Sequence, residues 1–453
     1  MRRKAWQIAL FFGLCLLDPT DAAGQALDVT ALSAGDLGSA RSASPTLSAP
    51  SAIWGNPGFL IDSPTRLYLG LGIKSERRAI QRGSLLVNQP LPETRDSASP
   101  LVSPRVVLAL PLAKNRFWLA IGYRPALRIE SAFKSAVDPN PARYLGDEFS
   151  LADHRVSLGV ALKLGRLRLG AAAEIGAVSL EVQRSLWVGF VADKGLMQVA
   201  SLDSKARLSL SGVNFAARLG IGLIATSWLR LGLSARVSAK SWLSGDVTLT
   251  RPQRAPGGYR AVSATGGTAK LWVGPPLELS VGLALRPHRR LGITAAFRFE
   301  GASRFDGLTA TLSDARYRLV STQTSEHRLE RLPLGIQAQD RFSLRCGAEL
   351  TVVEGFLRAR LGWAFERGAT PDDAPHSALL DLDRHLIGVS AQATIASLRL
   401  AVGVAHSLNA TLDSDGARTD VFNPLEKETT SVAGQGRFDT SSTRVIFEAQ
   451  LAW

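Results

Sequence analysis

The residues of this chain with most capacity for chemistry are arginines at alternate positions of apolar segments. "SWLRLGLSARVSAK" at 227–240 sets Arg230 and Arg236 among leucines, and "RLGITAAFRFE" at 290–300 sets Arg298 near Glu300. Such side chains could pair with carboxylates as a structural lining or hold the carboxylate of a ligand, and both interpretations stay open. The charges predicted to share an inner, polar face are Arg155, Arg218, Arg230, Arg236, Arg298, Arg345, Arg358, Arg360, Arg399, Arg444 and Glu448.

Catalytic and metal-binding patterns are missing from the sequence. The six histidines show no spacing typical of metal ligands, and no G-x-S-x-G nucleophile elbow occurs. His376 and Ser377 are neighbours, but adjacent residues on an extended segment point apart. "DSDG" at 413–416 resembles a calcium turn without the later ligands. We therefore predict no enzyme, no cofactor and no metal.

The distribution of charge and the cysteine content argue against a nucleic-acid-binding protein and against a disulfide-stabilised domain. The formal net charge is +14, but the basic residues are spread singly along the chain rather than clustered as a nucleic-acid site requires. Only Cys15 and Cys346 occur, so there is no disulfide framework. We expect no nucleic-acid partner.

The N-terminus predicts export. "MRRK" followed by the apolar run "AWQIALFFGLCLL" and small residues is typical of a secretory signal peptide over 1–22, cleaved near Ala22 or Ala23. A buried N-terminal helix is the alternative interpretation. No later stretch approaches the 18 apolar residues of a transmembrane helix. An exported chain of this kind is either soluble outside the inner membrane or a β-barrel.

The elements that would position the arginines are strands. In the terminal "STRVIFEAQLAW", Val445, Phe447, Ala449, Leu451 and Trp453 alternate with mostly polar residues, which is a strand period. A last strand ending in tryptophan is typical of outer-membrane barrels, although an edge strand of a sandwich would alternate too. Such strands are predicted near 65–74, 105–113, 116–125, 152–163, 166–184, 206–224, 228–242, 268–285, 290–300, 341–352, 355–365, 386–395, 397–406 and 442–453.

The links between these fourteen segments decide between barrel and sandwich. Six short links, such as "AKN" at 113–115, alternate without exception with seven long ones. Short periplasmic turns and long external loops are the pattern of up-and-down outer-membrane barrels, and sandwiches give no reason for it. The sequence therefore predicts an all-β fold, a 14-stranded antiparallel transmembrane β-barrel over 64–453.

Residues 23–63 precede the barrel and form a segment rich in Gly, Ser, Ala and Pro. The apolar residues of "AIWGNPGFL" require burial, so we predict that this segment plugs the lumen as a hatch; a disordered periplasmic tail is the alternative. "GDLGSARSASPTLSAPSAIWGNPGFL" resembles the N-terminal hatch of the FadL family of outer-membrane long-chain fatty-acid transporters. Asn56 and Pro57 match the Asn-Pro-Ala motif of that family, and Gly58 departs from its alanine. The hatch motif comprises Trp54, Asn56, Pro57, Gly58, Phe59 and Leu60.

The resemblance extends to late segments such as "LRARLGWAFERGATPDDAP" and "LRLAVGVAHSLNATL". It implies a monomeric, hatch-plugged barrel for passive uptake of hydrophobic compounds such as long-chain fatty acids. Ligands would be captured by apolar outer loops, pass beside the hatch, and leave through a lateral opening or after hatch movement. The alternatives are a non-transporting scaffold for a secretion or surface-attachment system and an open porin.

One long link could supply the capture surface. "SLWVGFVADKGLMQVA" at 185–200 is the most apolar of them, and exposed loops seldom carry so much apolar area without a purpose. It forms either a capture groove or a loop packed on its neighbours. The candidate groove residues are Trp187, Phe190, Val191, Leu196 and Met197.

The predicted location, the outer membrane of a Gram-negative bacterium, sets the expected partners. These are outer-membrane lipid and lipopolysaccharide, a hydrophobic small-molecule ligand, and the barrel-assembly machinery, which would recognise the strand ending in Trp453.

Overall fold

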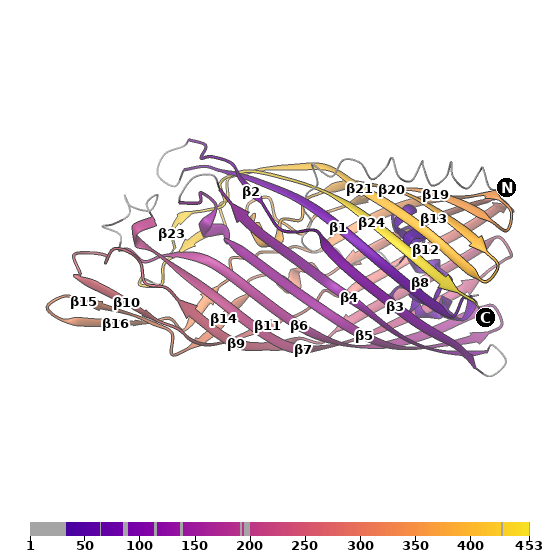
Figure 1. Cartoon of the computed structure of the whole chain (residues 1–453), viewed down its shortest axis with the longest axis horizontal. Coiled ribbons are helices and arrows are strands. Elements are labelled where there is room, and N and C mark those ends of the chain that lie inside the picture. The colour runs from indigo at the N-terminus through magenta and orange to yellow at the C-terminus, as the bar shows by residue number, and fades with distance from the viewer. Residues whose placement is uncertain are drawn as a thin grey trace.

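Alternation of apolar and polar residues produces long strands, and in the computed structural model these strands close into one antiparallel barrel of fourteen strands (Figure 1). The structure describes residues 33–63, 65–84, 89–112, 116–135, 139–190, 193, 200–426 and 429–452. The barrel strands are β1 (Leu67–Arg82), β3 (Leu101–Leu112), β4 (Phe117–Lys134), β5 (Glu148–Leu164), β6 (Leu167–Trp187), β7 (Asp203–Ile224), β8 (Leu229–Ser238), β12 (Glu278–His288), β13 (Leu291–Glu300), β18 (Arg341–Val353), β19 (Leu357–Glu366), β20 (Arg384–Ile395), β21 (Leu398–Ser414) and β24 (Gly436–Leu451).

Pairing of the first and last strands closes the wall. β1 pairs with β24 along its whole length, from Leu67 opposite Leu451 to Arg82 opposite Gly436. Short turns join the strands at the end where the C-terminus lies, which we call the turn end; the long links lie at the other, loop end (Figure 1). The predicted fold is confirmed.

Several wall strands are interrupted where the sequence predicted single segments. The predicted 268–285 is divided into β11 and β12, because Pro275 and Pro276 between them have no N–H for the ladder. In the loop half of the wall, shorter strands adjoin five of the barrel strands. β9 follows β8 and β14 follows β13, whereas β2, β11 and β17 precede β3, β12 and β18. The shorter strands are β9 (Ser241–Leu249), β11 (Gly267–Val273), β14 (Thr309–Ser313), β17 (Arg331–Pro333) and β2 (Thr94–Asp96).

The long links carry further small elements. β10, β15 and β16 form a three-stranded sheet that projects from the loop end, and β22 and β23 form a hairpin (Figure 1). The remaining bounds are β10 (Ala261–Thr265), β15 (Arg316–Val320), β16 (Thr324–Arg328), β22 (Asp420–Phe422), β23 (Thr429–Val432), η4 (Arg143–Leu145), η6 (Ala200–Leu202), η7 (Ala302–Phe305) and η8 (Ser377–Leu379). The hatch holds α2 (Ala34–Gly38), η1 (Ser44–Thr46), η2 (Pro50–Trp54) and η3 (Pro57–Asp62).

The two faces of the wall differ as lipid and lumen require. Along β7, Val213, Phe215, Leu219 and Ile221 are exposed outward, whereas Arg218 between them is buried inside. Apolar side chains facing out and polar ones facing in are the pattern of a membrane barrel. The core of this molecule therefore lies inside the lumen, where hatch and loops pack against the wall.

Candidate functional site

The described hatch residues 33–63 lie inside the barrel toward the turn end (Figure 1). They form short helices, and prolines at 45, 50 and 57 occupy the first turn of η1, η2 and η3, where a missing N–H costs no hydrogen bond. α2 packs on β20 and β21, and η3 packs on β6 and β7. The hatch boundary at residue 23 lies outside the described residues, and the signal peptide and its cleavage site stay predictions.

Asn56 is the hydrogen-bonding centre of the hatch. Its Nδ2 donates to the carbonyl oxygens of Pro45 and Ile221, both at 2.9 Å, and its Oδ1 accepts from the Gly58 N–H at 3.1 Å. One buried side chain thus caps η3, ties two hatch turns together and attaches them to β7. An alanine Cβ at Gly58 would lie 3.1 Å from three oxygen atoms, so the crowded site favours glycine there.

The inner wall makes room for the hatch with glycines on successive strands. A Cβ at any of these positions would overlap hatch atoms: Gly220 meets Asn56 and Pro57, Gly362 meets Ser39, and Gly388 meets Leu37. The same holds for Gly170, Gly232 and Gly403. They lie on two runs of three neighbouring strands, β6–β8 and β19–β21. We call these residues the glycine seat.

The apolar hatch residues are buried, as predicted. Trp54, Phe59 and Leu60 are at most 1% exposed. Trp54 Nε1 donates to Ser157 Oγ at 3.2 Å, and its ring meets Tyr68 edge-on with centroids 6.3 Å apart. The hatch is therefore anchored on the β1–β5 side by side chains and on the β6–β21 side by backbone contact with glycines.

A belt of ion pairs crosses the lumen above the hatch. Arg155 contacts Glu174 at 2.9 Å, and Glu278 accepts from Arg218 at 2.9 Å and from Arg236 at 3.1 Å. The belt continues through Arg298 with Glu300 and Arg345 with Glu366. These predicted arginines all lie on the inner face and are buried. Removing one partner of such a buried pair leaves an uncompensated charge, at a cost of roughly 3–5 kcal/mol.

Sequence reasoning missed part of this belt. Glu174, Glu366, Arg124, Arg341 and Arg384 also belong to it. Glu174 stands at the same strand parity as the buried Arg168, so extending the alternation along β6 would have found it. Which strands would face each other across the lumen was not readable from local sequence.

Arg124 is a special member of the belt. It is 1% exposed, and none of its three guanidinium nitrogens has a hydrogen-bond partner in the described structure. Its nearest carboxylate oxygen, on Glu174, is 4.0 Å away, and the guanidinium lies over the Trp54 ring at 5.5 Å. A buried guanidinium retains unused donors here, directly above the hatch.

The remaining predicted charges lie lower on the inner wall. Arg358, Arg360 and Arg399 are only partly buried near the turn end, and Glu349 pairs with Arg360 at 2.7 Å. Arg230 donates to Ser48 of the hatch at 3.0 Å. The buried Glu448 accepts from the Ala34 N–H at 2.7 Å, which places a carboxylate at the start of α2. Arg444, also on β24, is buried as well.

The wall has a break between β3 and β4. Their ladder ends at Val106 opposite Tyr123, although β3 continues to pair with β1 as far as Leu101. Beyond this point β4 has a bulge between Pro125 and Leu127 in its pairing with β5. A bulge bends a strand and changes its twist, and here it coincides with the loss of pairing to β3. Across the break, Arg128 donates to the Val102 carbonyl oxygen at 3.2 Å.

Four cations gather at this break, and two of them have acid partners: Arg128 pairs with Glu130 at 2.6 Å and Lys74 pairs with Glu76. A cavity of about 30 Å³ is bounded by Lys74, Arg105, Arg128, Arg444 and Ser103, with no carboxylate in its lining. On the lipid side lies a groove of about 660 Å³ lined mainly by apolar side chains such as Leu69, Leu71 and Phe447. Arg105 lines both spaces. A cationic cavity and an apolar surface groove thus meet at one residue of the wall.

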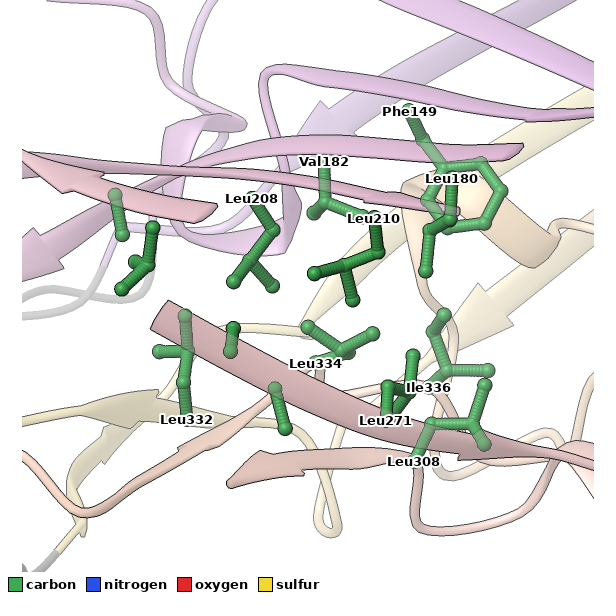
Figure 2. Close-up of a cluster of buried hydrophobic side chains, with 14 of the residues drawn as sticks. Phe149, Leu180, Val182, Leu208, Leu210, Leu271, Leu308, Leu332, Leu334 and Ile336 are labelled. Atoms are coloured by element: carbon green, nitrogen blue, oxygen red, sulfur yellow. The ribbon is translucent and has the colours of Figure 1, made fainter. Parts of the chain in front are cut away.

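The loop half of the lumen is apolar. Figure 2 shows Phe149, Leu180, Val182, Leu208 and Leu210 from wall strands facing Leu271, Leu308, Leu332, Leu334 and Ile336. The cavity left between several of them is about 10 Å³, no more than one water molecule needs. Folded links therefore fill the lumen here, and a solute entering from the loop end meets apolar side chains before the charge belt.

The described residues of the predicted capture loop divide into two groups. Trp187 is fully buried among Phe133, Tyr144 and Leu145, so it packs on neighbouring links as the alternative interpretation had it. Phe190 is partly exposed and lies beside Tyr259 and His327, with ring centroids 6.1 and 6.5 Å apart. Val191, Leu196 and Met197 lie outside the described residues.

Two searches of the described residues gave negative results. No helix in them has the length and apolar character that crossing a membrane would require. Nowhere in the described ranges do three His, Cys, Asp or Glu side chains gather as a metal ion would need.

Comparisons with known proteins were made after this geometry. Residues 14–450 match the family model described as "Outer membrane protein transport protein (OMPP1/FadL/TodX)". No curated protein sequence matches the chain.

Solved structures resemble the fold over nearly its whole length. A Pseudomonas aeruginosa FadL homologue superposes with a TM-score of 0.73 at 15% identity, over 95% of this chain and 100% of that one. The P. putida toluene transporter TodX gives 0.66 at 14% identity, over 94% and 99%. The Ralstonia pickettii toluene transporter TbuX gives 0.61 at 15% identity, over 93% and 99%.

Proposed function

Because the chain belongs to the FadL/TodX family of outer-membrane transport proteins, we propose that it takes up long-chain fatty acids and similar carboxylate-headed amphiphiles passively. The family consists of outer-membrane transporters of hydrophobic compounds, and solved relatives include toluene transporters. The ligand class is therefore the question, and neutral aromatics are the competing answer.

The observation that carries the proposal is the position of Arg105 at the break between β3 and β4. A small cavity lined by four cations and an apolar, lipid-facing groove both border Arg105. A carboxylate gains charge-assisted hydrogen bonds from such cations, and its hydrocarbon tail gains burial along the groove. A neutral aromatic would use only the second contribution.

The path begins at the loop end. Phe190, Tyr259 and His327 come from three different long links and form a partly exposed aromatic cluster. An apolar tail can contact these rings and then the apolar loop half of the lumen, where side chains would have to give way, since the free space is small. The anionic head would then reach Arg124, whose donors are unused, and leave sideways past Arg105. The hatch stays on its glycine seat during this passage.

Ligand binding tests the head-group preference. Purified protein in detergent would be loaded with a fluorescent C16 fatty acid and titrated with palmitate, methyl palmitate or toluene. We expect palmitate to compete at least 10-fold better than its methyl ester, which has the same chain without the charge. Equal competition by the ester, or better competition by toluene, would contradict the carboxylate class. No binding of any of them would favour the scaffold alternative.

Deletion of the bulge tests the lateral route. Ala126 is the extra residue between Pro125 and Leu127, so its deletion restores regular pairing and leaves both halves of β4 facing as before. We expect the deletion variant to bind palmitate but to lose most fatty-acid uptake in whole cells, because β4 can then pair with β3. Deleting Asn409, one of the two residues that face Ser441 in the β21 bulge, is the matched control and should leave uptake unchanged. Normal uptake by the Ala126 deletion would rule out the route.

A further inference from the structure

Exposed charges at the loop end divide into two sectors. The sector over β7, β9, β11, β14, β17 and the projecting sheet is basic, and the sector over β1–β5 and β19–β24 is acidic. Exposed cations of the basic sector are Lys205, Arg207, Arg251, Arg254, Arg260, Lys270, Arg316, Arg318, Arg328 and Arg331, and its exposed acids are Glu181, Asp246, Asp306, Asp314, Glu326, Glu330 and Asp340. Exposed acids of the other sector are Glu93, Glu148, Asp372, Asp383, Asp413, Asp415 and Asp420, and its exposed cations are Arg95, Arg367, Arg418 and Arg437.

The two sectors also differ in how their cations are used. In the acidic sector, arginines pair with nearby acids, as Arg95 does with Glu93 at 2.6 Å and Arg437 with Asp439 at 3.1 Å. In the basic sector, Lys205, Lys270 and Arg331 have no carboxylate within 4.0 Å among the described residues. The same holds there for Arg251, Arg254, Arg260 and Arg318. Exposed cations without a close carboxylate are available to an external anion, and Lys205 is less available than Lys270 and Arg331 because it lies near Asp147.

Two of these cations, Lys270 and Arg331, stand just above the membrane-facing wall, and Lys205 lies further along β7 toward the loop end. Trp242 and Trp272 pack against each other on the outer face, with centroids 3.9 Å apart and ring planes tilted by 33°, as in an aromatic girdle. Lys270 lies two residues beyond Trp272 on the same face, roughly 7 Å along the strand. Through Thr311 its row continues to Arg331 on β17. Below the girdle, the outer face of β7 is apolar, with Val213 and Phe215 about half exposed.

A ligand that matches this surface has phosphate groups on the loop-end side of Trp242 and Trp272 and acyl chains on the other side. We propose that the outer face of β7, β9, β11, β14 and β17 binds the phosphorylated head group of the outer-leaflet glycolipid, lipid A. Lys270 and Arg331 contact phosphate oxygens, and Lys205 and the more distant arginines attract the anionic core. The acyl chains lie on the apolar wall beneath Trp242 and Trp272. This site is on the outside of the wall, so it does not depend on the transport proposed above.

Lipid binding by the intact, detergent-purified protein tests this site. Native mass spectrometry would count bound diphosphoryl lipid A for the wild type and for the triple variant K205Q/K270Q/R331Q. Each such cation near an anionic surface contributes about a factor of five, so we expect the triple variant to bind on the order of 10- to 100-fold more weakly. The loss should shrink as ionic strength rises, because the contacts are exposed.

A second triple variant provides the matched control. R95Q/R418Q/R437Q removes the same charge from the acidic sector, where each arginine has an acid partner, and should bind lipid A like the wild type. Equal loss in both variants would overturn the proposal, since net charge would then explain it. Equal binding of dephosphorylated lipid A would overturn it too. Full competition by millimolar inorganic phosphate would also overturn the assignment to lipid A, because the surface would then bind any small anion.

Discussion

At the scale of single residues, the buried His376 connects three outer links. It lies against Gly146 and Gly335, and its neighbour Ser377 donates to the Leu145 carbonyl oxygen at 2.7 Å. Burial, together with the nearby Arg184 guanidinium, lowers the pKa of His376 to about 3. The neutral imidazole therefore belongs to the folded state, and protonation works against these contacts.

This shift predicts a pH dependence. An unfolded histidine titrates near 6.5, so the contribution of His376 to stability is present above that value and is lost as pH falls toward 3. We expect wild-type protein to lose more thermal stability between pH 7.5 and 4.5 than H376Q does. The melting temperature in detergent at both pH values measures this, with H406Q, an exposed histidine on the outer face, as control.

Asp147 also makes folding stability depend on pH in this range, but its contribution decreases as pH rises, whereas that of His376 increases. Burial raises the pKa of Asp147 to about 6, so the folded state favours the protonated acid and stability falls as pH rises from about 4 to 6. Because this contribution is present in both proteins, it cancels in the difference between wild type and H376Q. An equal loss of melting temperature in both would show that His376 is not protonated on unfolding.

At the scale of elements, the glycine seat determines how closely the hatch can approach the wall. Gly362 on β19 contacts the Ser39 backbone so closely that a methyl group there requires the hatch to move. We therefore expect G362A to raise single-channel conductance and expose the hatch to protease. Gly292 also faces the lumen, but a Cβ there would meet its nearest atom only at 3.6 Å, so G292A should keep both properties at wild-type values. Unchanged conductance in G362A would contradict this prediction and would mean that β19, rather than the hatch, moves to accommodate the methyl group.

The same elements show what the sequence could and could not predict. Alternation in "SWLRLGLSARVSAK" and its equivalents predicted the strands, and the parity of link lengths predicted the barrel. Pro275 and Pro276 mark a break that local sequence does reveal. The loss of pairing between β3 and β4 was not predictable, because it depends on register between segments rather than on the composition of either one. The residues that surround Arg124 and Glu174 in the lumen were not predictable for the same reason.

At the scale of the whole molecule, an apolar outer face surrounds a charged interior. Leu219 lies in the middle of the outward apolar run of β7 and is 62% exposed. Its replacement by arginine should cost about 2–4 kcal/mol in a bilayer, whereas L219F should be nearly neutral. Urea titration of the barrel folded in lipid vesicles measures both. If L219R were as stable as L219F, this face would not be turned to hydrocarbon.

The bond between Glu448 and the Ala34 N–H joins two segments from opposite ends of the chain. Glu448 is on β24, which is synthesised after every other strand of the wall. The docking site of α2 is therefore complete only once β24 is part of the wall, and we expect the hatch to reach its final position late in assembly. A protease that cleaves the hatch only when it is not packed in the lumen would then measure the fraction of barrels whose assembly is complete.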